Sequence, residues 1–131
     1  MEIRERCDAV KLQIDKRSPV YLQIVDYFKE QIASGQLRKG EEIPSRRELA
    51  GLLKVNPNTV QRAYKKMEEE GLIFTEGNLP SRVTRDEKVI QHVRHELLTS
   101  SLQEFVSTAK KLRIPLEQLV ENLKREYESS D

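Results

Sequence analysis

The segment Val55-Asn56-Pro57-Asn58 constrains the fold of this chain most strongly, because it separates two stretches with helical periodicity. Proline has no backbone N–H and disfavours helical geometry at the residue before it, so the first stretch has to end near Lys54. Asn58 is able to cap the second stretch, which we expect to form a helix from about Thr59 to Glu70. The sequence therefore predicts two helices joined by a tight turn.

Apolar residues on both sides of this turn recur at the spacing of helices that bury one face. Ser45 can cap the helix before the turn, and Gly71 can end the helix after it in the left-handed conformation that glycine tolerates. Both helices are therefore expected to face one core. The core positions are Leu49, Ala50, Leu52 and Leu53 before the turn and Val60, Ala63, Tyr64 and Met67 after it.

Three further elements complete the pattern. A helix is expected from Pro19 to Ser34, with Ser18 as its N-cap. Residues 41–44 form a short extended segment that ends in proline. Two β-prone runs, Leu72–Thr75 and Arg82–Thr84, flank a turn-forming segment and are predicted to form a hairpin. The apolar stripe of the first helix consists of Tyr21, Ile24, Val25, Phe28 and Ile32.

The order of these elements is helix, extended segment, helix, turn, helix and hairpin. This is the order of the winged helix-turn-helix, whose third helix can enter the major groove of DNA while its hairpin reaches the flanking backbone or minor groove. A generic three-helix core with a hairpin has the same order. Topology alone therefore leaves both interpretations open.

Three motifs, in the order Ile43–Ala50 (IPSRRELA), Val55–Tyr64 (VNPNTVQRAY) and Glu68–Ile73 (EEEGLI), resemble the GntR family of bacterial regulators. The Asn-Pro-Asn-Thr-Val turn followed by Arg-Ala-Tyr, together with the short C-terminal region, is similar to the YtrA subfamily in particular. The resemblance covers Ser18–Thr84. It implies a winged helix-turn-helix regulator that binds operator DNA.

The distribution of charge supports a nucleic-acid surface in the first part of the chain. The whole chain has 23 basic and 22 acidic residues, which by itself is uninformative. Residues 38–66 contain eight basic and three acidic residues, an excess of five positive charges. Residues 86–131 contain seven basic and nine acidic residues, a net charge of −2. A surface that attracts phosphates is therefore expected within residues 38–66.

The resemblance assigns roles to two residues of the second helix. Ser45 matches a position that holds a DNA phosphate, a role that its hydroxyl and the helix N-terminus also suit. Arg47 matches an arginine that reaches a base, where a guanidinium can pair with guanine O6 and N7. The alternative for Arg47 is an exposed ion pair with Glu48 or Glu68.

Short polar side chains open the third helix, where they can meet base edges or phosphates. Many family members have arginines where this chain has Pro57 and Gln61, so those arginine contacts are not expected here. Gln61 is suited instead to read adenine. Asn58 and Thr59 have helix capping as their alternative role.

The wing also departs from the family, because Pro80, Ser81 and Arg82 replace its usual glycines and aromatic residue. Its expected contribution is reduced to phosphate contacts of Arg82 and Arg85. Arg62 and the lysines after it suit phosphate contacts or solvent-facing charges equally well. The predicted DNA-binding set is Ser45, Arg46, Arg47, Asn56, Asn58, Thr59, Gln61, Arg62, Tyr64, Lys65 and Arg82.

The 46 residues beyond Arg85 are too few for a ligand-sensing domain. Their periodicity predicts one long helix from Asp86 to about Arg113 and a shorter one that begins at Pro115. A second copy is the natural cover for their apolar stripes, whereas packing of both helices on their own winged domain is the alternative. The predicted dimerisation residues are Ile90, Val93, Leu97, Leu98, Leu102, Phe105, Leu112, Leu119 and Leu123.

We therefore expect an α+β, mostly helical chain. It comprises an N-terminal tail (1–17), a winged helix-turn-helix domain (18–85) and a helical dimerisation region (86–131). The expected function is that of a sequence-specific regulator, a repressor that binds a palindromic operator as a homodimer, near its own or a transporter operon as the resemblance implies. The alternative is a winged-helix protein-interaction module that no longer binds DNA.

Other functions are not expected. No nucleophile elbow or glycine-rich phosphate loop is present, which excludes the common enzyme classes, and we expect no cofactor. His92, His95 and Glu96 lack a further ligand and do not form an established zinc motif. Cys7 is expected to be an inert thiol. Without a membrane span or signal peptide, the chain is expected in the cytoplasm, with no membrane partner; a small-molecule effector is left open.

Overall fold

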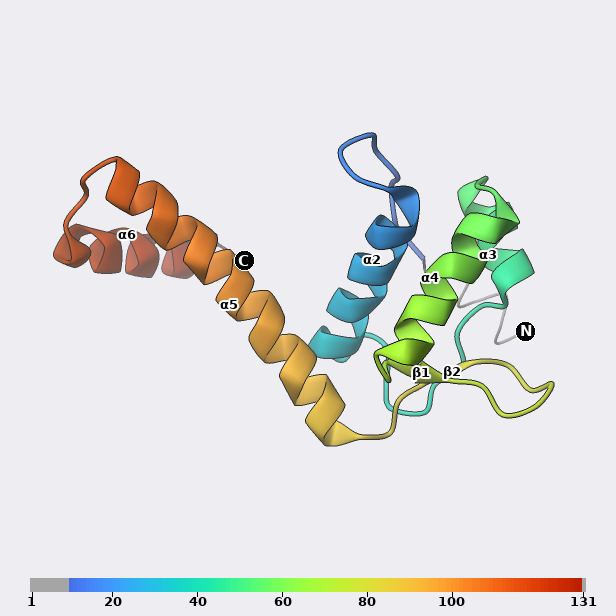
Figure 1. Ribbon diagram of the computed structural model, residues 1–131. Helices are drawn as coiled ribbons and strands as arrows, with labels where there is room; N and C mark the ends of the chain where they lie inside the picture. Colours follow the sequence, from blue (N-terminus) through green and yellow to red (C-terminus); the bar gives the residue numbers. More distant parts are fainter. Residues whose placement is uncertain (1–9, 131) are drawn as a thin grey trace. The chain divides into compact units, whose positions relative to one another are not determined.

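The computed structural model describes residues 10–130, and Figure 1 shows their helices and strands in chain order. Cys7 lies outside the described residues. The chain divides into two compact units between Arg94 and His95, a position within helix α5 (Glu87–Lys111). Among the described residues, no helix is both long enough and apolar enough to cross a membrane.

The first unit contains three helices, α2 (Val20–Ser34), α3 (Arg46–Leu53) and α4 (Pro57–Glu69), close to the predicted positions. Helix α4 packs against both α2 and α3. The predicted cap of the first helix is wrong. Pro19 occupies the N-cap position of α2, and no side-chain hydrogen bond caps this helix.

The turn between α3 and α4 is tighter than the sequence predicts. Helix α3 ends at Leu53, and its C-cap, Lys54, has a left-handed φ of 57°. Asn56, not Asn58, caps α4, because its side-chain oxygen accepts the backbone N–H of Asn58 at 2.8 Å. Pro57 then becomes the first helical residue, where its fixed φ is favourable and its missing N–H costs nothing. The helix therefore begins two residues earlier than expected.

Local signals at the other helix ends match the structure. Ser45 and Glu48 form a capping box: the Ser45 hydroxyl accepts the Glu48 N–H, and the Glu48 carboxylate accepts the Ser45 N–H, both at 3.1 Å. Gly71 follows α4 with φ +75° and donates its N–H to the carbonyl of Glu68. The predicted cap at Ser45 and the predicted glycine stop are confirmed.

The predicted hairpin is formed by strands β1 (Ile73–Phe74) and β2 (Arg82–Val83). They pair antiparallel, with Ile73 opposite Val83 and Phe74 opposite Arg82. Glu42 bridges to Arg82 on the other side of β2. The extended segment before α3 is therefore joined to the base of the wing.

The core of the first unit lies between α2, α3, α4 and the hairpin. Phe28 and Tyr64 meet edge to face near its centre, with ring centroids 6.1 Å apart. Leu52, predicted as a core residue, is instead 39% exposed because α3 turns it toward solvent. Almost completely buried side chains include Ile24, Val25, Phe28, Ile32, Ile43, Leu49, Val60, Ala63, Tyr64, Met67, Leu72 and Val83.

The second unit comprises the remainder of α5 and helix α6 (Leu116–Ser129). Arg113 takes a left-handed φ of 58° after α5, and the Ile114 N–H bonds back to the carbonyl of Ala109. Pro115, predicted as the first residue of the shorter helix, is instead the N-cap of α6, which begins at Leu116. Ala109 is buried at this corner, whereas α6 contains no buried residue. The α+β, mostly helical fold class is confirmed.

Candidate DNA-binding surface

Helix α4 has a buried apolar face and an exposed polar face. Its buried residues are those predicted from periodicity. Its exposed polar residues lie on the opposite side of the helix and offer amide and cationic groups to solvent. They are Asn58, Gln61, Arg62 and Lys65. Such a face can present hydrogen-bond donors and acceptors to base edges and phosphates in a major groove.

The start of α3 contributes two exposed residues beside this face. The Ser45 oxygen is used in the capping box, but its hydroxyl proton can still be donated to a phosphate. Arg47 is exposed in the first turn of α3. The two alternative partners considered for Arg47 have other contacts, because Glu48 accepts the Ser45 N–H and Glu68 pairs with Arg46.

Arg46 connects α3 to α4. Its Nη2 atom lies 2.7 Å from the Glu68 carboxylate, and its guanidinium lies 4.9 Å from the centre of the Tyr64 ring. The side chain is about one-third exposed, and its Nε is buried without a hydrogen-bond partner. The charge of Arg46 is paired with Glu68, and its side chain holds α3 against α4. Arg46 therefore stabilises the surface and is less available to contact DNA itself.

The prediction that Tyr64 contacts DNA is wrong. Its side chain is completely buried, and its hydroxyl donates a hydrogen bond to the carbonyl of Pro44. This bond joins α4 to the segment that enters α3. Tyr64 therefore belongs to the core, as its place in the apolar stripe of α4 also indicates.

Arg62 has a partner that the sequence did not reveal. Its guanidinium lies 3.8 Å from the centre of the Tyr21 ring, and its Nη2 donates to the Tyr21 hydroxyl at 3.3 Å. Tyr21 comes from the first turn of α2, where its spacing predicted only a core role. No local pattern marks this pair, because the two residues are 41 positions apart.

The wing differs from a basic DNA-reaching hairpin. The Arg82 guanidinium donates to the carbonyl of Gly40 at 2.9 Å and pairs with Glu42 at 3.0 Å, so its charge is compensated at the base of the hairpin. The Arg85 guanidinium lies 4.8 Å from the centre of the Phe74 ring. The tip carries Leu79, which is 62% exposed. The tip of the wing, residues 76–80, therefore contains no cationic side chain to offer a phosphate.

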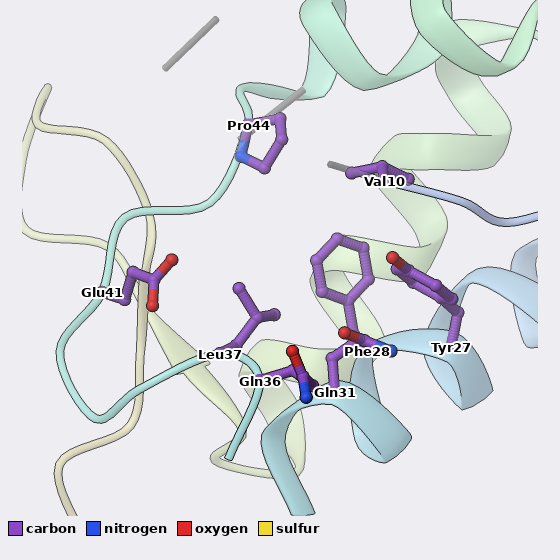
Figure 2. Close-up of a pocket in the computed structure, with 8 residues that line it drawn as sticks. All are labelled: Val10, Tyr27, Phe28, Gln31, Gln36, Leu37, Glu41 and Pro44. Atoms are coloured by element: carbon purple, nitrogen blue, oxygen red, sulfur yellow. The ribbon is translucent and has the colours of Figure 1, made fainter. Parts of the chain in front are cut away.

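The described part of the first unit includes a small pocket and an open groove. The pocket has a volume of about 130 Å³. Figure 2 shows Tyr27, Phe28, Leu37 and Pro44 among the residues that line it. Typical sites for drug-sized ligands measure about 300–1,000 Å³, so this pocket is too small for such a ligand. An open groove of about 310 Å³ lies between the end of α2 and the start of α5.

Two of the predicted dimerisation residues pack inside the first unit. Ile90 is 9% and Val93 is 4% exposed, and Ile90 shares the open groove with Ile32 and Leu37. Both residues are already covered within the single chain, so their burial does not require a second copy, and their assignment to a dimer surface stays a prediction. The apolar stripe of α5 is therefore buried near the start of the helix and exposed farther along it.

The second unit exposes the other apolar residues. Leu97 and Leu119 are half-buried, and the remainder of the predicted set is exposed. Several large apolar residues that were not in that set are exposed as well. The exposed residues are Leu98, Leu102, Phe105, Leu112, Leu116, Val120, Leu123 and Tyr127.

Charged groups outside α3 and α4 form exposed ion pairs, such as that between Lys39 and Glu87. No group of three His, Cys, Asp or Glu side chains within residues 10–130 is arranged to hold a metal ion. The Lys39 amine, 2.7 Å from the Glu87 carboxylate, and the Gln91 amide both donate to Glu87 and lower its pKa. This ion pair is exposed and joins the loop after α2 to the first turn of α5.

Comparison with known proteins agrees with this geometry. Residues 20–83 match the family described as bacterial regulatory proteins of the gntR family. The transcriptional regulator YhcF of Bacillus subtilis is 32% identical over 86% of this chain and 93% of its own length. The chain belongs to the GntR family. The family match confirms a regulator with a helix-turn-helix DNA-binding domain, and the relatives named here are transcriptional regulators.

A relative named YtrA supports the YtrA-like assignment, and a solved structure supports the GntR fold. The transcriptional repressor YtrA of Bacillus subtilis is 34% identical over 86% of this chain and 89% of its own length. A solved GntR-family regulator from Listeria monocytogenes has a TM-score of 0.81 and 34% identity, and it covers 86% of this chain and 98% of its own. The similarity to both extends beyond the family match at residues 20–83 and includes part of the C-terminal helices.

Proposed function

We propose that this chain is a sequence-specific transcription repressor that binds a palindromic operator as a homodimer in the cytoplasm. The observation that carries the proposal is the exposed polar face of α4, which stands opposite a fully buried apolar face on a winged helix-turn-helix core. A recognition helix needs this combination, because the core fixes its direction while the polar face reads the groove. The similarity to a relative named as a repressor supports the direction of regulation.

Within this face, we assign sequence reading to Arg47 and Gln61. Both are exposed, and their guanidinium and amide groups can form paired hydrogen bonds with guanine and adenine. Ser45, Arg62 and Lys65 are assigned to phosphates, which fix the position of the domain along the duplex.

The homodimer is proposed from the second unit. It leaves several leucines, Phe105 and Tyr127 exposed to water, and exposed apolar side chains that lie together mark interaction surfaces. A two-fold axis would cover this surface with the same surface of a second copy and would place two recognition helices for a symmetric site. Residues 18–85 would then act as the DNA-binding domain, and the segment beyond them would supply the dimer contacts mainly from residue 95 onward.

The proposal is tested by selecting duplexes from random sequence with the full chain and by footprinting the selected site. We expect a two-fold symmetric footprint with half-sites about one helical turn, or a small multiple of it, apart. Selection that yields no enriched sequence, together with equal binding to all duplexes, would contradict sequence-specific regulation. Sedimentation of the free protein tests the dimer separately.

The second candidate function is a protein-interaction module, and the wing favours it. The charge of Arg82 is compensated by Glu42, and the apolar Leu79 stands exposed at the tip. The selection experiment also distinguishes this function, because an interaction module would not enrich a DNA sequence.

The operator of the proposed repressor is expected near the chain's own gene or a transporter operon. A reporter fused to those promoters would test this.

A further inference from the structure

The pair formed by Arg62 and Tyr21 lies at the edge of the polar face of α4 that adjoins α2. The ring of Tyr21 supports the guanidinium from one side at 3.8 Å, and the Tyr21 hydroxyl accepts one of its N–H groups at 3.3 Å. Arg62 is exposed and Tyr21 is half-buried. The pair is therefore anchored in the domain by Tyr21 but open to a ligand at Arg62.

Three arginines near this surface differ in how their charges are compensated. Arg46 pairs with Glu68, and Arg82 pairs with Glu42. Within residues 10–130, Arg62 has no carboxylate partner and packs instead on an uncharged ring. Its positive charge therefore remains available to an external anion.

The hydrogen bond between the two side chains leaves suitable donors for such an anion. A guanidinium has five N–H donors, and Arg62 gives one of them to Tyr21. Because the Tyr21 oxygen accepts this bond, its own hydroxyl proton is left to donate elsewhere. The stacked geometry also limits the rotation of the long arginine side chain, which reduces the entropy lost when it binds.

We infer that Tyr21 and Arg62 together bind one phosphate of the DNA backbone beside the recognition helix. The guanidinium supplies the charge, the tyrosine hydroxyl supplies a second donor, and the ring holds the guanidinium against α2. The contact with Tyr21 turns the Arg62 guanidinium toward α2. We therefore expect it to meet a phosphate of the DNA strand at the edge of the major groove. The inference rests on the proposed insertion of α4 into the major groove, and it adds α2 to the DNA-binding surface.

The test compares Tyr21→Leu, Arg62→Gln and the double variant in the full chain. Binding is measured over a range of salt concentrations to a duplex selected by the intact protein and to an unselected duplex of the same length. Lys88→Gln, which removes one exposed charge from the first turn of α5, is the matched charge control. Thermal unfolding of each variant checks that the domain remains folded.

We expect Arg62→Gln to weaken binding to both duplexes and to reduce the slope of log K against log salt by about 0.9 for each half-site. Tyr21→Leu should weaken binding by about two- to fivefold per half-site, with little change in slope, because the charge remains but its support is lost. The double variant should lose less than the sum of the single losses, since both residues act on one phosphate. Lys88→Gln should retain both the affinity and the slope of the intact protein.

Three results would overturn the inference. If Tyr21→Leu binds as tightly as the intact chain, the tyrosine has no part in binding. If Arg62→Gln loses affinity only for the selected duplex, Arg62 reads a base and does not hold a phosphate. If the losses of the two single variants are additive, the residues act independently. Failure of the proposed function is distinguishable from these results, because the intact chain would then select no duplex.

Discussion

Replacing Ile90 by alanine tests the division of helix α5 between the two units. Ile90 lies before the boundary, is 9% exposed and shares a groove with Ile32 and Leu37 of the first unit. Truncating a buried isoleucine typically costs about 2–5 kcal/mol. Because Ile90 lies beside a groove that is open to solvent, water can enter the space left behind. We therefore expect the lower part of this range, about 2–3 kcal/mol.

Leu98→Ala is the matched comparison, because Leu98 lies on the same helix, beyond the boundary, and is 69% exposed. Its truncation should leave the first unit's stability nearly unchanged. In a homodimer, each copy would lose about 1.5–3 kcal/mol of stabilisation from apolar burial. The loss would occur twice, because a two-fold dimer contains two copies of the residue. The dimer dissociation constant should therefore rise by about two orders of magnitude or more.

Two measurements separate these effects. Urea denaturation at several protein concentrations reports unfolding together with its dependence on association, and sedimentation equilibrium reports the monomer–dimer equilibrium alone. We expect Ile90→Ala to lower unfolding stability without changing the dissociation constant. We expect Leu98→Ala to raise the dissociation constant without lowering the stability of the first unit. The reasoning would be refuted if Ile90→Ala weakened association while unfolding of the first unit stayed unchanged.

Three other predictions follow from the site and its supports. Arg47→Ala should lose most of its affinity for the selected duplex and little for random DNA, whereas Lys65→Ala should weaken both and reduce the salt dependence, as duplex titrations would show. Asn56→Ala should destabilise the chain by about 1 kcal/mol in urea denaturation through loss of the cap of α4, and Asn58→Ala should have little effect on stability. A fragment that ends at Arg94 should be a folded monomer in sedimentation and bind the selected duplex at least about a hundredfold more weakly, because the second half-site is no longer held nearby; a dimeric or tightly binding fragment would contradict the proposed architecture.

The elements of the fold could be predicted because their signals are local. Apolar spacing, the Ser45–Glu48 capping box and Gly71 each act within a few residues. A short window of sequence is therefore enough to predict where a helix lies and where it begins or ends. The prediction failed where two local rules competed. Asn58 can cap a helix, but Pro57 is favourable as the first helical residue. Because the helix begins at Pro57, the capping residue is Asn56.

The supports of the site could not be predicted, because they depend on contacts between distant residues. Arg46 and Arg62 are both basic residues of the same charged segment, and charge counting treats them alike. The fold gives Arg46 a carboxylate partner 22 positions away and gives Arg62 a tyrosine ring 41 positions away. Tyr64 shows a different error, because its place in a family motif predicts a DNA contact, whereas the periodicity of α4 places it in the core, where the structure has it.

The apolar stripe of α5 shows why periodicity cannot identify a partner. The spacing of leucine, isoleucine and valine states only that one side of the helix is buried, and burial inside the chain and burial in a dimer produce the same pattern. The structure separates the two by coverage: Ile90 and Val93 are already buried within the single chain, whereas Leu98 and Leu102 are exposed. Since the first two residues would gain little from a second copy, any dimer has to derive its apolar stabilisation from the helical surface beyond the boundary. Variants that probe association should therefore be placed after His95, and variants before it will report on the stability of the DNA-binding unit.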